Sequence, residues 1–373
     1  MKNSEKIKEL FRKETVLCIA AILAVISAFV VTPDREYLGY IDVRVLSLLF
    51  SLMVVMAGLQ KRGIFTALAS VLIPRANHTG QLRLLLVFLC FFSSMLITND
   101  VSLITFVPFT VIIYTMAGLR EQMLSVIVLQ TIAANLGSML TPVGNPQNLY
   151  LYSISGMKMG EFIMTMLPLT LVSGVLLYVC CVIPKKQELH AELEQKQLCP
   201  DKSGKLCIGF YAVLFVISLL SVLRIVPYQI PLFLAVVGAF FTDRQILRKV
   251  DYSLLLTFVS FFIFIGNMGR IEPVKMFLSD ILTGRELIVG FLSSQIISNV
   301  PAAVLLSGFT NNWQELLKGV NIGGLGTLIA SMASLISYKL YVKEEPDRKL
   351  AYLCRFTGMN ILFAVVLLVA GRI

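Results

Sequence analysis

Two polar segments interrupt long apolar runs, one in each half of the chain. Residues 93–100 read SSMLITND, and residues 293–300 read SSQIISNV. A proline follows in each case, at Pro108 and at Pro301. A polar break in an apolar helix leaves backbone N–H and C=O groups without partners, and lipid supplies none. Such breaks persist where they line a cavity or are packed inside protein, so a pair of them predicts a transporter binding site at a repeat interface.

A further break lies at residues 141–148, which read TPVGNPQN. Two prolines and a glycine in this short stretch cannot continue a helix, so we expect two half-helices joined by an unwound loop. The loop offers three amide side chains and open backbone groups. Its counterpart in the second half, residues 330–334 (ASMAS), is small and hydroxylic. A proline kink supported by neighbouring helices is the alternative, but the three amides favour the wall of a site.

At a hairpin tip, helix N-termini suit an anion, whereas unwound carbonyls and helix C-termini suit a cation. Asn99 and Asn299 can serve either, or they can simply cap or connect helices. Asp100 is the one carboxylate in the two tips, and Val300 replaces it in the second half. A carboxylate at that depth is costly unless it is paired, protonated or bound to a cation, which predicts a group that carries H⁺ or ligates Na⁺. A cap on the returning helix arm is the alternative.

The candidate substrate- and ion-binding residues therefore follow from the breaks. They are Thr98, Asn99, Asp100, Ser102, Thr141, Gly144, Asn145, Pro146, Gln147, Asn148, Ser298, Asn299, Val300, Pro301, Ser331 and Ser334. No resident metal and no cofactor are expected, because neither the seven cysteines nor the two histidines have metal-ligand spacing. A coupling Na⁺ would lie near Asn99, Asp100 and Asn145.

Composition identifies the class of protein. Of 373 residues, 57% are hydrophobic and 14% are charged, and the mean hydropathy is +0.82. Soluble domains are about 45–50% apolar and about 25% charged, so this is an integral membrane protein. The net charge of +10 is spread over many short loops. That distribution fits orientation in a membrane and argues against a nucleic-acid partner.

We expect an all-α membrane protein, an inverted-repeat secondary transporter with two re-entrant helical hairpins and two broken helices. Residues 1–183 would form the first repeat, 184–205 a cytoplasmic linker, and 206–373 an extra helix and the second repeat. The expected hairpins span 81–118 and 286–310, and the expected broken helices span 121–155 and 319–341. The remaining expected helices span 15–31, 43–59, 162–183, 206–222 and 351–370.

Matched landmarks in the same order support the repeat. Ile41-Asp42 is echoed by Val250-Asp251, Leu136–Ser138 by Leu325–Thr327, and Leu151-Tyr152 by Leu340-Tyr341. Five expected full crossings separate the starts of the two repeats, and an odd number inverts the second. With the N-terminus in the cytoplasm, most of the 32 Lys and Arg residues fall on the cytoplasmic side. The first hairpin would then enter from the cytoplasm and the second from outside.

These motifs resemble the ion transporter superfamily with the citrate-transporter-like domain, over nearly the whole chain. Thr98–Asp100 followed by Pro108 is similar to the hairpin of arsenite pump membrane subunits and of bacterial sodium/proton antiporters in that superfamily. Residues 298–301 resemble the second hairpin tip, and residues 144–148 the loop of the first broken helix. The dicarboxylate branch carries Ser-Asn-Thr at both tips, from which this chain departs. The resemblance implies a homodimer and an elevator-like motion of the hairpin domain.

The predicted function is secondary active transport of a small ion, an inorganic or carboxylate anion, coupled to H⁺ or Na⁺ across the plasma membrane. A sodium/proton antiporter of the same superfamily is the main alternative. A passive channel is less favoured, because two breaks closed at both faces argue against an open pore. An intramembrane enzyme is not favoured, since the helices lack paired aspartates, a Ser–His arrangement or a metal motif.

Overall fold

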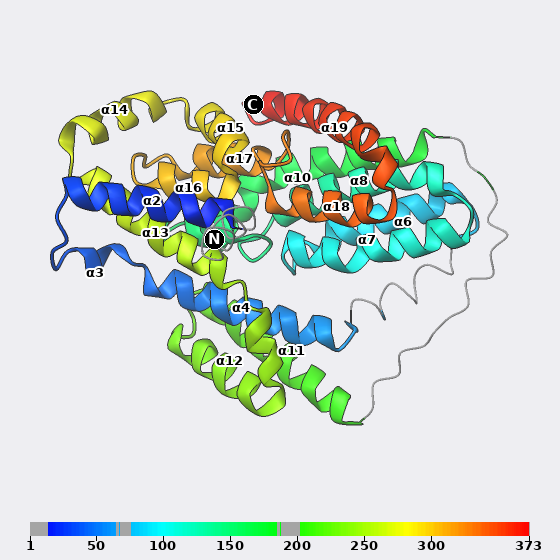
Figure 1. Ribbon diagram of the computed structural model, residues 1–373, viewed down its shortest axis with the longest axis horizontal. Coiled ribbons are helices and arrows are strands. Elements are labelled where there is room, and N and C mark those ends of the chain that lie inside the picture. The colour runs from blue at the N-terminus through cyan, green and yellow to red at the C-terminus, as the bar shows by residue number, and fades with distance from the viewer. Residues whose placement is uncertain (1–13, 65–66, 68–75, 185–186, 188–201, 373) are drawn as a thin grey trace, which may run out of the picture.

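The computed structural model describes residues 14–64, 67, 76–184, 187 and 202–372. Within this part every regular element is a helix (Figure 1). Five helices are long and apolar enough to cross a membrane, with mean hydropathies between 1.4 and 2.1. The prediction of an all-α membrane protein is confirmed. The expected linker 184–205 and the basic N-terminus fall largely outside the described residues.

The described helices and 3₁₀ turns follow one another along the chain. Their bounds are α2 (Thr15–Val30), α3 (Tyr37–Tyr40), α4 (Val43–Lys61), α6 (Thr79–Ser93), α7 (Asn99–Met116), α8 (Arg120–Ser138), α9 (Pro146–Ser155), α10 (Met159–Val182), α11 (Lys202–Val222), α12 (Gln229–Thr242), the 3₁₀ turn η2 (Arg244–Lys249), α13 (Tyr252–Gly269), α14 (Glu272–Leu282), α15 (Glu286–Ile297), α16 (Asn299–Ser307), α17 (Trp313–Ile322), α18 (Met332–Glu344), the 3₁₀ turn η3 (Pro346–Arg348) and α19 (Lys349–Ala370).

The helices break where the polar segments predict. In the first half, α6 and α7 are the arms of a hairpin, and residues 139–145 separate α8 from α9. In the second half, α15 and α16 are hairpin arms, and residues 323–331 separate α17 from α18. Asn145 begins α9 by accepting a hydrogen bond from the backbone N of Asn148 at 3.0 Å, and Pro146 follows it, a usual first helical residue.

Several described elements differ from the sequence expectation, and α3, α12 and α13 lie outside the expected helix ranges. The helix expected to begin at residue 319 begins at Trp313, because the side chain of Asn312 caps it by accepting from the backbone N of Glu315. The short helix α14 was not anticipated. Charged residues lie among the apolar residues of its sequence, and such a mixture is typical of a loop as well as of a helix at the surface.

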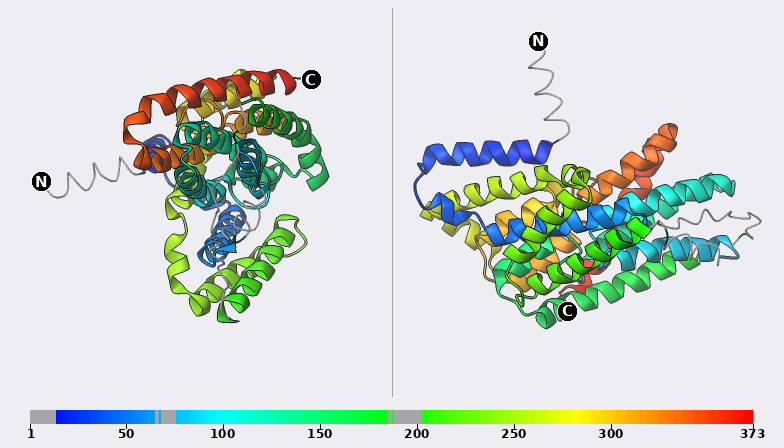
Figure 2. Two further views of the ribbon diagram at one scale, coloured as in Figure 1. Left: turned by 90° about the vertical axis from the view of Figure 1, so that its right-hand side faces the viewer. Right: turned by 90° about the horizontal axis from the view of Figure 1, so that it is seen from below.

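Helices of the two halves pack crosswise. Helix α2 lies against α13, and α12 lies against α4, with α11 beside both α4 and α12 (Figures 1 and 2). Closer to the centre, α7 packs on α18, and α16 packs on α9. Asp42 and Asp251, which the sequence comparison paired, both cap the start of a helix. Asp42 caps α4 by accepting from Val45 N, and Asp251 caps α13 by accepting from Leu254 N, each at 2.9 Å.

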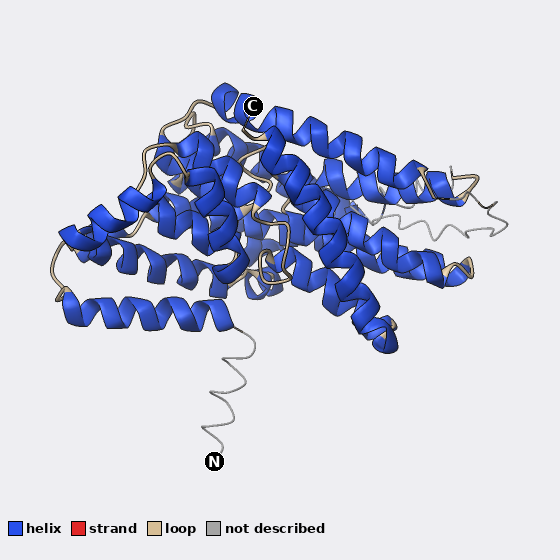
Figure 3. Cartoon of the chain, turned by 90° about the horizontal axis from the view of Figure 1, so that it is seen from above, coloured by secondary structure: helices blue, strands red, loops and turns tan. Residues whose placement is uncertain are grey.

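The long axis of the molecule separates two ends of the helical body. Along this axis, which is horizontal in Figures 1 and 3, α6, α7 and α8 lie toward one end and α2 and α13 toward the other. An ion pair ties the loop after α2 to the end of α13, since Arg270 Nη1 lies 2.7 Å from Asp34 Oδ2. That hydrogen bond holds the pKa of Asp34 below its usual value. Both side chains are more than a third exposed, so the pair adds little stability.

Candidate functional site

Both hairpin tips are held by a backbone hydrogen bond to a helix break. The backbone N of Asn99 donates to the carbonyl oxygen of Gly144 at 3.1 Å. In the second half, the backbone N of Asn299 donates to the carbonyl oxygen of Ala330 at 2.9 Å. Each hairpin tip therefore closes against the break of its own half, and it does so through the equivalent pair of backbone groups.

A threonine hydroxyl makes a second matched contact between each break and its hairpin. Thr141 Oγ1 donates to the carbonyl oxygen of Met95. Thr327 Oγ1 donates to the carbonyl oxygen of Gln295 at 3.1 Å. Met95 lies just beyond the end of α6 and Gln295 in the last turn of α15, where helical hydrogen bonding ends and acceptors need partners. The threonines thus satisfy backbone groups that the breaks expose.

Glycines allow the same close approach in both halves. A Cβ atom on Gly137 would lie 2.0 Å from the carbonyl oxygen of Phe91 and 2.5 Å from Ser94 Oγ. A Cβ atom on Gly323 would lie 2.4 Å from Ser294 Oγ. The broken helix therefore touches the hairpin arm at a glycine and a serine in each half. Gly137 therefore corresponds to Gly323. The sequence comparison paired Gly137 with Gly326, three residues further along the chain.

Two asparagines within helices join the halves, and sequence reasoning missed both. Asn321, in α17, is buried and connects to the first-half break. Its Oδ1 accepts from Asn145 Nδ2 at 3.2 Å, and its Nδ2 donates to Asn148 Oδ1 at 2.7 Å. Asn145 Nδ2 also donates to Ser138 Oγ at 3.1 Å. The first-half break is therefore fixed by a residue of the second half.

Asn135, in α8, makes the reciprocal set of bonds. Its Oδ1 accepts from Ser331 Oγ at 3.0 Å, and its Nδ2 donates to Ser334 Oγ at 3.3 Å. It also accepts from Asn99 Nδ2 at 3.0 Å, which brings the first hairpin tip into the network. Asn135 and Asn321 are 4% and 2% exposed. A buried polar network of this kind must be fully bonded to be tolerated, which fixes the relative positions of its five helices, α7, α8, α9, α17 and α18.

Asn135 and Asn321 share a sequence pattern that could have identified them. Asn135-Leu136-Gly137 and Asn321-Ile322-Gly323 have the same pattern of asparagine, aliphatic residue and glycine. Neither asparagine lies at a proline or in a polar cluster, so neither carries the signals that indicate a helix break. Their side chains face the polar centre although their neighbours along the chain are apolar.

Asp100 lies in the first turn of α7 and is half-buried. Its Oδ1 is inaccessible to solvent and has no hydrogen-bond partner among the described residues. Among the described residues, the Asp100 carboxylate accepts no hydrogen bond from a backbone N–H, and the backbone N of Asp100 donates to Asn99 Oδ1 at 3.0 Å. The expected alternative of a helix cap is therefore not the arrangement that the structure has.

The hydroxyl residues at the tips have local partners. Ser102 Oγ lies 2.9 Å from Ser93 Oγ, so it joins the two arms of the first hairpin. Ser298 Oγ donates to the carbonyl oxygen of Ala330 at 3.4 Å. Thr98 precedes α7 in an extended conformation, and its side chain makes no capping bond. Ser102 and Ser298 therefore stabilise the hairpins, whereas the Thr98 hydroxyl makes no such contact.

Two amide side chains at the breaks are also available. Gln147 and Asn299 are 1% and 4% exposed, and neither side chain forms a hydrogen bond within the described part of the chain. Val300 and Pro301 are buried in the first turn of α16. Pro146 is half-buried at the start of α9. The centre thus combines a bonded asparagine network with unbonded polar groups beside it.

Comparison with known proteins identifies the family. A family model described as citrate transporter (CitMHS) matches residues 5–331. An uncharacterized transporter of Methanocaldococcus jannaschii is 38% identical over 71% of this chain and 72% of its own. The inner membrane protein YbiR of Escherichia coli is 28% identical over 84% of each chain. The magnetosome protein MamN of Magnetospirillum gryphiswaldense is 22% identical over 89% of this chain and 85% of its own.

Most of the chain is matched by the family, and the helices, breaks and polar centre described above lie within the matched residues or directly follow them. The fold is that of a multi-pass membrane protein. The expected resemblance is confirmed: the chain belongs to the CitMHS citrate transporter family of membrane transporters, within the ion transporter superfamily.

Proposed function

We propose that this transporter is a secondary active carrier of a small ion, an inorganic or carboxylate anion, coupled to H⁺ or Na⁺. The observation that carries the proposal is the matched closure of two hairpin tips on two helix breaks, joined across the halves by Asn135 and Asn321. Irregular backbone within a membrane protein is retained where it forms a binding site, and matched breaks in two repeats are typical of secondary transporters.

The helix ends at this centre favour an anion. Four helices begin there, α7 at Asn99, α9 at Pro146, α16 at Asn299 and α18 at Met332. A helix N-terminus carries roughly half a positive charge and unpaired N–H groups, so the anion would bind at these four N-termini, whereas the C-termini of α6, α8, α15 and α17 at the same breaks would suit the coupling cation. The unbonded amides of Gln147 and Asn299 would orient the substrate by hydrogen bonds.

Asp100 is the proposed coupling group. Its buried Oδ1 has no partner in the described residues, and a carboxylate so placed binds a proton or a cation. With Na⁺, the oxygens of Asn99 and Asn145 would be the neighbouring ligands. Because Asp100 has no counterpart in the second half, where Val300 stands, coupling would be asymmetric. The same carboxylate favours one further candidate, a sodium/proton antiporter, in which Asp100 would bind Na⁺ and H⁺ in turn.

The remaining features of the proposal concern placement. The two halves would be inverted in the plasma membrane, with a cytoplasmic N-terminus, the first hairpin opening to the cytoplasm and the second to the outside. The matched, crosswise contacts of α7 with α18 and of α16 with α9 support a two-fold relation between the halves. A homodimer with an elevator-like motion stays a prediction from the resemblance.

The test is transport in proteoliposomes. Arsenite, citrate, succinate and sulfate are offered with and without Na⁺ and pH gradients, and Na⁺/H⁺ exchange is followed with a pH-sensitive dye. For the substrate found, Asp100→Asn should stop gradient-driven uptake and leave equilibrium exchange measurable, since asparagine keeps the shape but cannot titrate. Asp280→Asn, an exposed carboxylate on α14, is the matched control and should behave as wild type. Wild-type gradient-driven uptake by Asp100→Asn would rule out its coupling role.

A further inference from the structure

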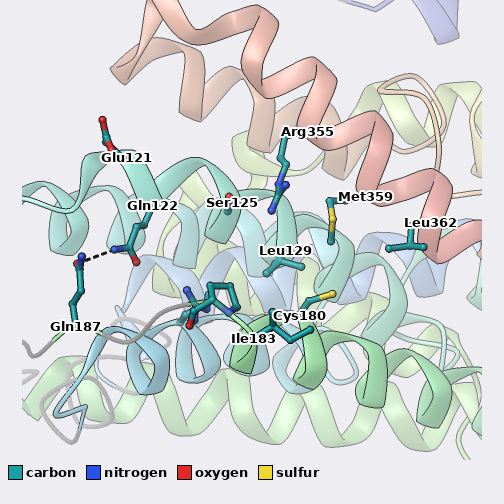
Figure 4. A pocket seen from close by; sticks show the side chains of 12 residues that line it. Glu121, Gln122, Ser125, Leu129, Cys180, Ile183, Gln187, Arg355, Met359 and Leu362 are labelled. Carbon is teal, nitrogen blue, oxygen red and sulfur yellow. Dashed lines mark hydrogen bonds between the residues drawn. The ribbon is translucent and has the colours of Figure 1, made fainter.

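A cavity of about 530 Å³ lies away from the central site, where the ends of four helices meet. It is bordered by α8, α10 and α19, together with Arg83 of α6. Polar residues such as Gln122 and Gln187 lie on one side of it, and apolar residues such as Met359 and Leu362 lie on the other (Figure 4). The lining is Arg83, Glu121, Gln122, Ser125, Leu129, Cys180, Ile183, Pro184, Gln187, Arg355, Met359 and Leu362.

Two guanidinium groups border this cavity without a carboxylate partner. Among the ion pairs of the described residues, none involves Arg83 or Arg355. Glu121, the one acidic lining residue, points away from the cavity (Figure 4) and lies 3.8 Å from Arg348. The cavity is therefore electropositive, since its acidic residue is directed toward another arginine.

Arg83 is the more unusual of the two, because it is 3% exposed. Its Nε donates to the carbonyl oxygen of Cys181 at 2.8 Å, and its Nη2 donates to that of Pro184 at 3.3 Å. These bonds satisfy carbonyls at the end of α10, where a cation is favourable. They do not neutralise the charge, and a buried cation is costly without an anion beside it.

Arg355 extends from α19 toward Leu129 and Cys180, into the cavity (Figure 4). Its side chain donates to no backbone carbonyl among the described residues, and its own backbone lies within the regular helix α19. Gln122 and Gln187 are bonded to each other at 3.0 Å on the opposite border. The position of Arg355 thus has no explanation in hydrogen bonds within the described protein.

The cavity also adjoins the apolar outer surface. Ile183 and Leu362 line it and are 75% and 52% exposed, as expected of side chains that face hydrocarbon. Its polar rim lies at helix ends, the level of lipid headgroups. Basic pockets between transmembrane helices at this level are suited to phosphate-bearing headgroups, with acyl chains along the apolar wall. Arginine matches a phosphate by bidentate hydrogen bonds.

We propose that this cavity binds the phosphate headgroup of an anionic membrane lipid between Arg83 and Arg355. The lipid would join α19, the last helix, to α6, α8 and α10 of the first half of the chain. This site is independent of the proposed transport chemistry, because none of its residues belongs to the central network.

The test compares variants in micelles titrated with phosphatidylglycerol, phosphatidylcholine or inorganic phosphate. Thermal unfolding and native mass spectrometry of bound lipid are the two readouts. Phosphatidylglycerol should raise the unfolding midpoint of the wild type, and the other two should not at equal concentration. Arg355→Gln should need about tenfold more phosphatidylglycerol, the loss expected for one charge-assisted hydrogen bond. Lys349→Gln, exposed at the start of the same helix, is the matched control and should respond as wild type.

A second variant keeps the test independent of that one side chain. Ser125→Phe should place an aromatic ring in the cavity, obstruct the lipid headgroup and abolish the retained lipid while both arginines remain. An unchanged phosphatidylglycerol response in Arg355→Gln, or retained lipid in Ser125→Phe, would overturn the proposal. A response of the wild type to inorganic phosphate alone would replace the lipid with a soluble oxyanion and overturn it equally.

Discussion

Removing the Asn321 side chain should separate the two halves of the central network. In Asn321→Ala, Asn148 Oδ1 loses the one side chain that donates to it, and Asn145 Nδ2 keeps only Ser138 Oγ. Side-chain hydrogen bonds between transmembrane helices contribute about 0.6 kcal/mol on average and about 1.7 kcal/mol at most. Two such bonds join Asn321 to α9 and its cap, so the free energy of unfolding should fall by about 1–3 kcal/mol.

A double-mutant cycle isolates the bond from the rest of the change. The four proteins are the wild type, Asn148→Ala, Asn321→Ala and the double variant, each unfolded by denaturant in micelles. If the 2.7 Å bond between the two amides is as strong as its burial suggests, the coupling free energy should be about 0.6–1.7 kcal/mol. Additive losses would refute the idea that this bond connects the halves.

The matched control is Asn267→Ala. Asn267 is also buried and also donates between elements, to Ser27 Oγ at 2.9 Å and to Tyr37 OH at 2.8 Å, but it lies outside the central network. It should lose a similar amount of stability while the folded protein keeps its transport rate. Asn321→Ala should lose transport as well. Equal transport by the two variants would show that the network is only structural.

Two further predictions concern the close approach of the halves and their orientation. Gly137→Ala should unfold at lower denaturant than Gly323→Ala, because its Cβ would lie 2.0 Å from the backbone carbonyl oxygen of Phe91, whereas that of Gly323 would lie 2.4 Å from Ser294 Oγ and 2.6 Å from Ser294 Cβ. Overpacking should cost about 1–3 kcal/mol, and Gly160→Ala, with nothing within 4 Å, is the control. Cysteines replacing the exposed Arg120 and Arg285 should react with a membrane-impermeant reagent from the cytoplasm and from outside, respectively. Reaction of both from one side would contradict the inverted arrangement.

Local sequence signals located the helix breaks because the physics of a break is local. Helix α7 begins at Asn99 and α16 at Asn299, as the polar segments indicated, and Pro146 opens α9. A proline or an unpaired backbone group cannot be compensated from a distance in lipid, so the break shows in its own residues. The same reasoning gave the first hairpin its arms within two residues of their observed ends.

Sequence reasoning failed where a contact depends on the partner helix. Asn135 and Asn321 are ordinary helical residues until α8 and α17 are placed against the opposite break. The expected register paired Leu136–Ser138 with Leu325–Thr327, since those letters match best. The structure pairs Gly137 with Gly323, because both must admit a serine of the hairpin arm. Here packing between helices, and not residue identity, determines equivalence.

The places where the two halves differ are informative because so much else is matched. Five residues, 94–98, turn the first hairpin, whereas the second turns at Ser298 alone, with φ at +74°, a left-handed value that is rare and costly for serine. The backbone contacts of Asn99 and Asn299 are nevertheless the same. The longer turn is followed by Asp100, and the tight turn is followed by Val300. The matched backbone contacts hold both tips at equivalent positions. The one carboxylate of the two tips, Asp100, lies on the hairpin with the longer turn. Binding of an ion at Asp100 can thus affect the first tip without requiring the same change in the second. The proposed coupling at Asp100 would therefore rest on a difference between two otherwise matched tips.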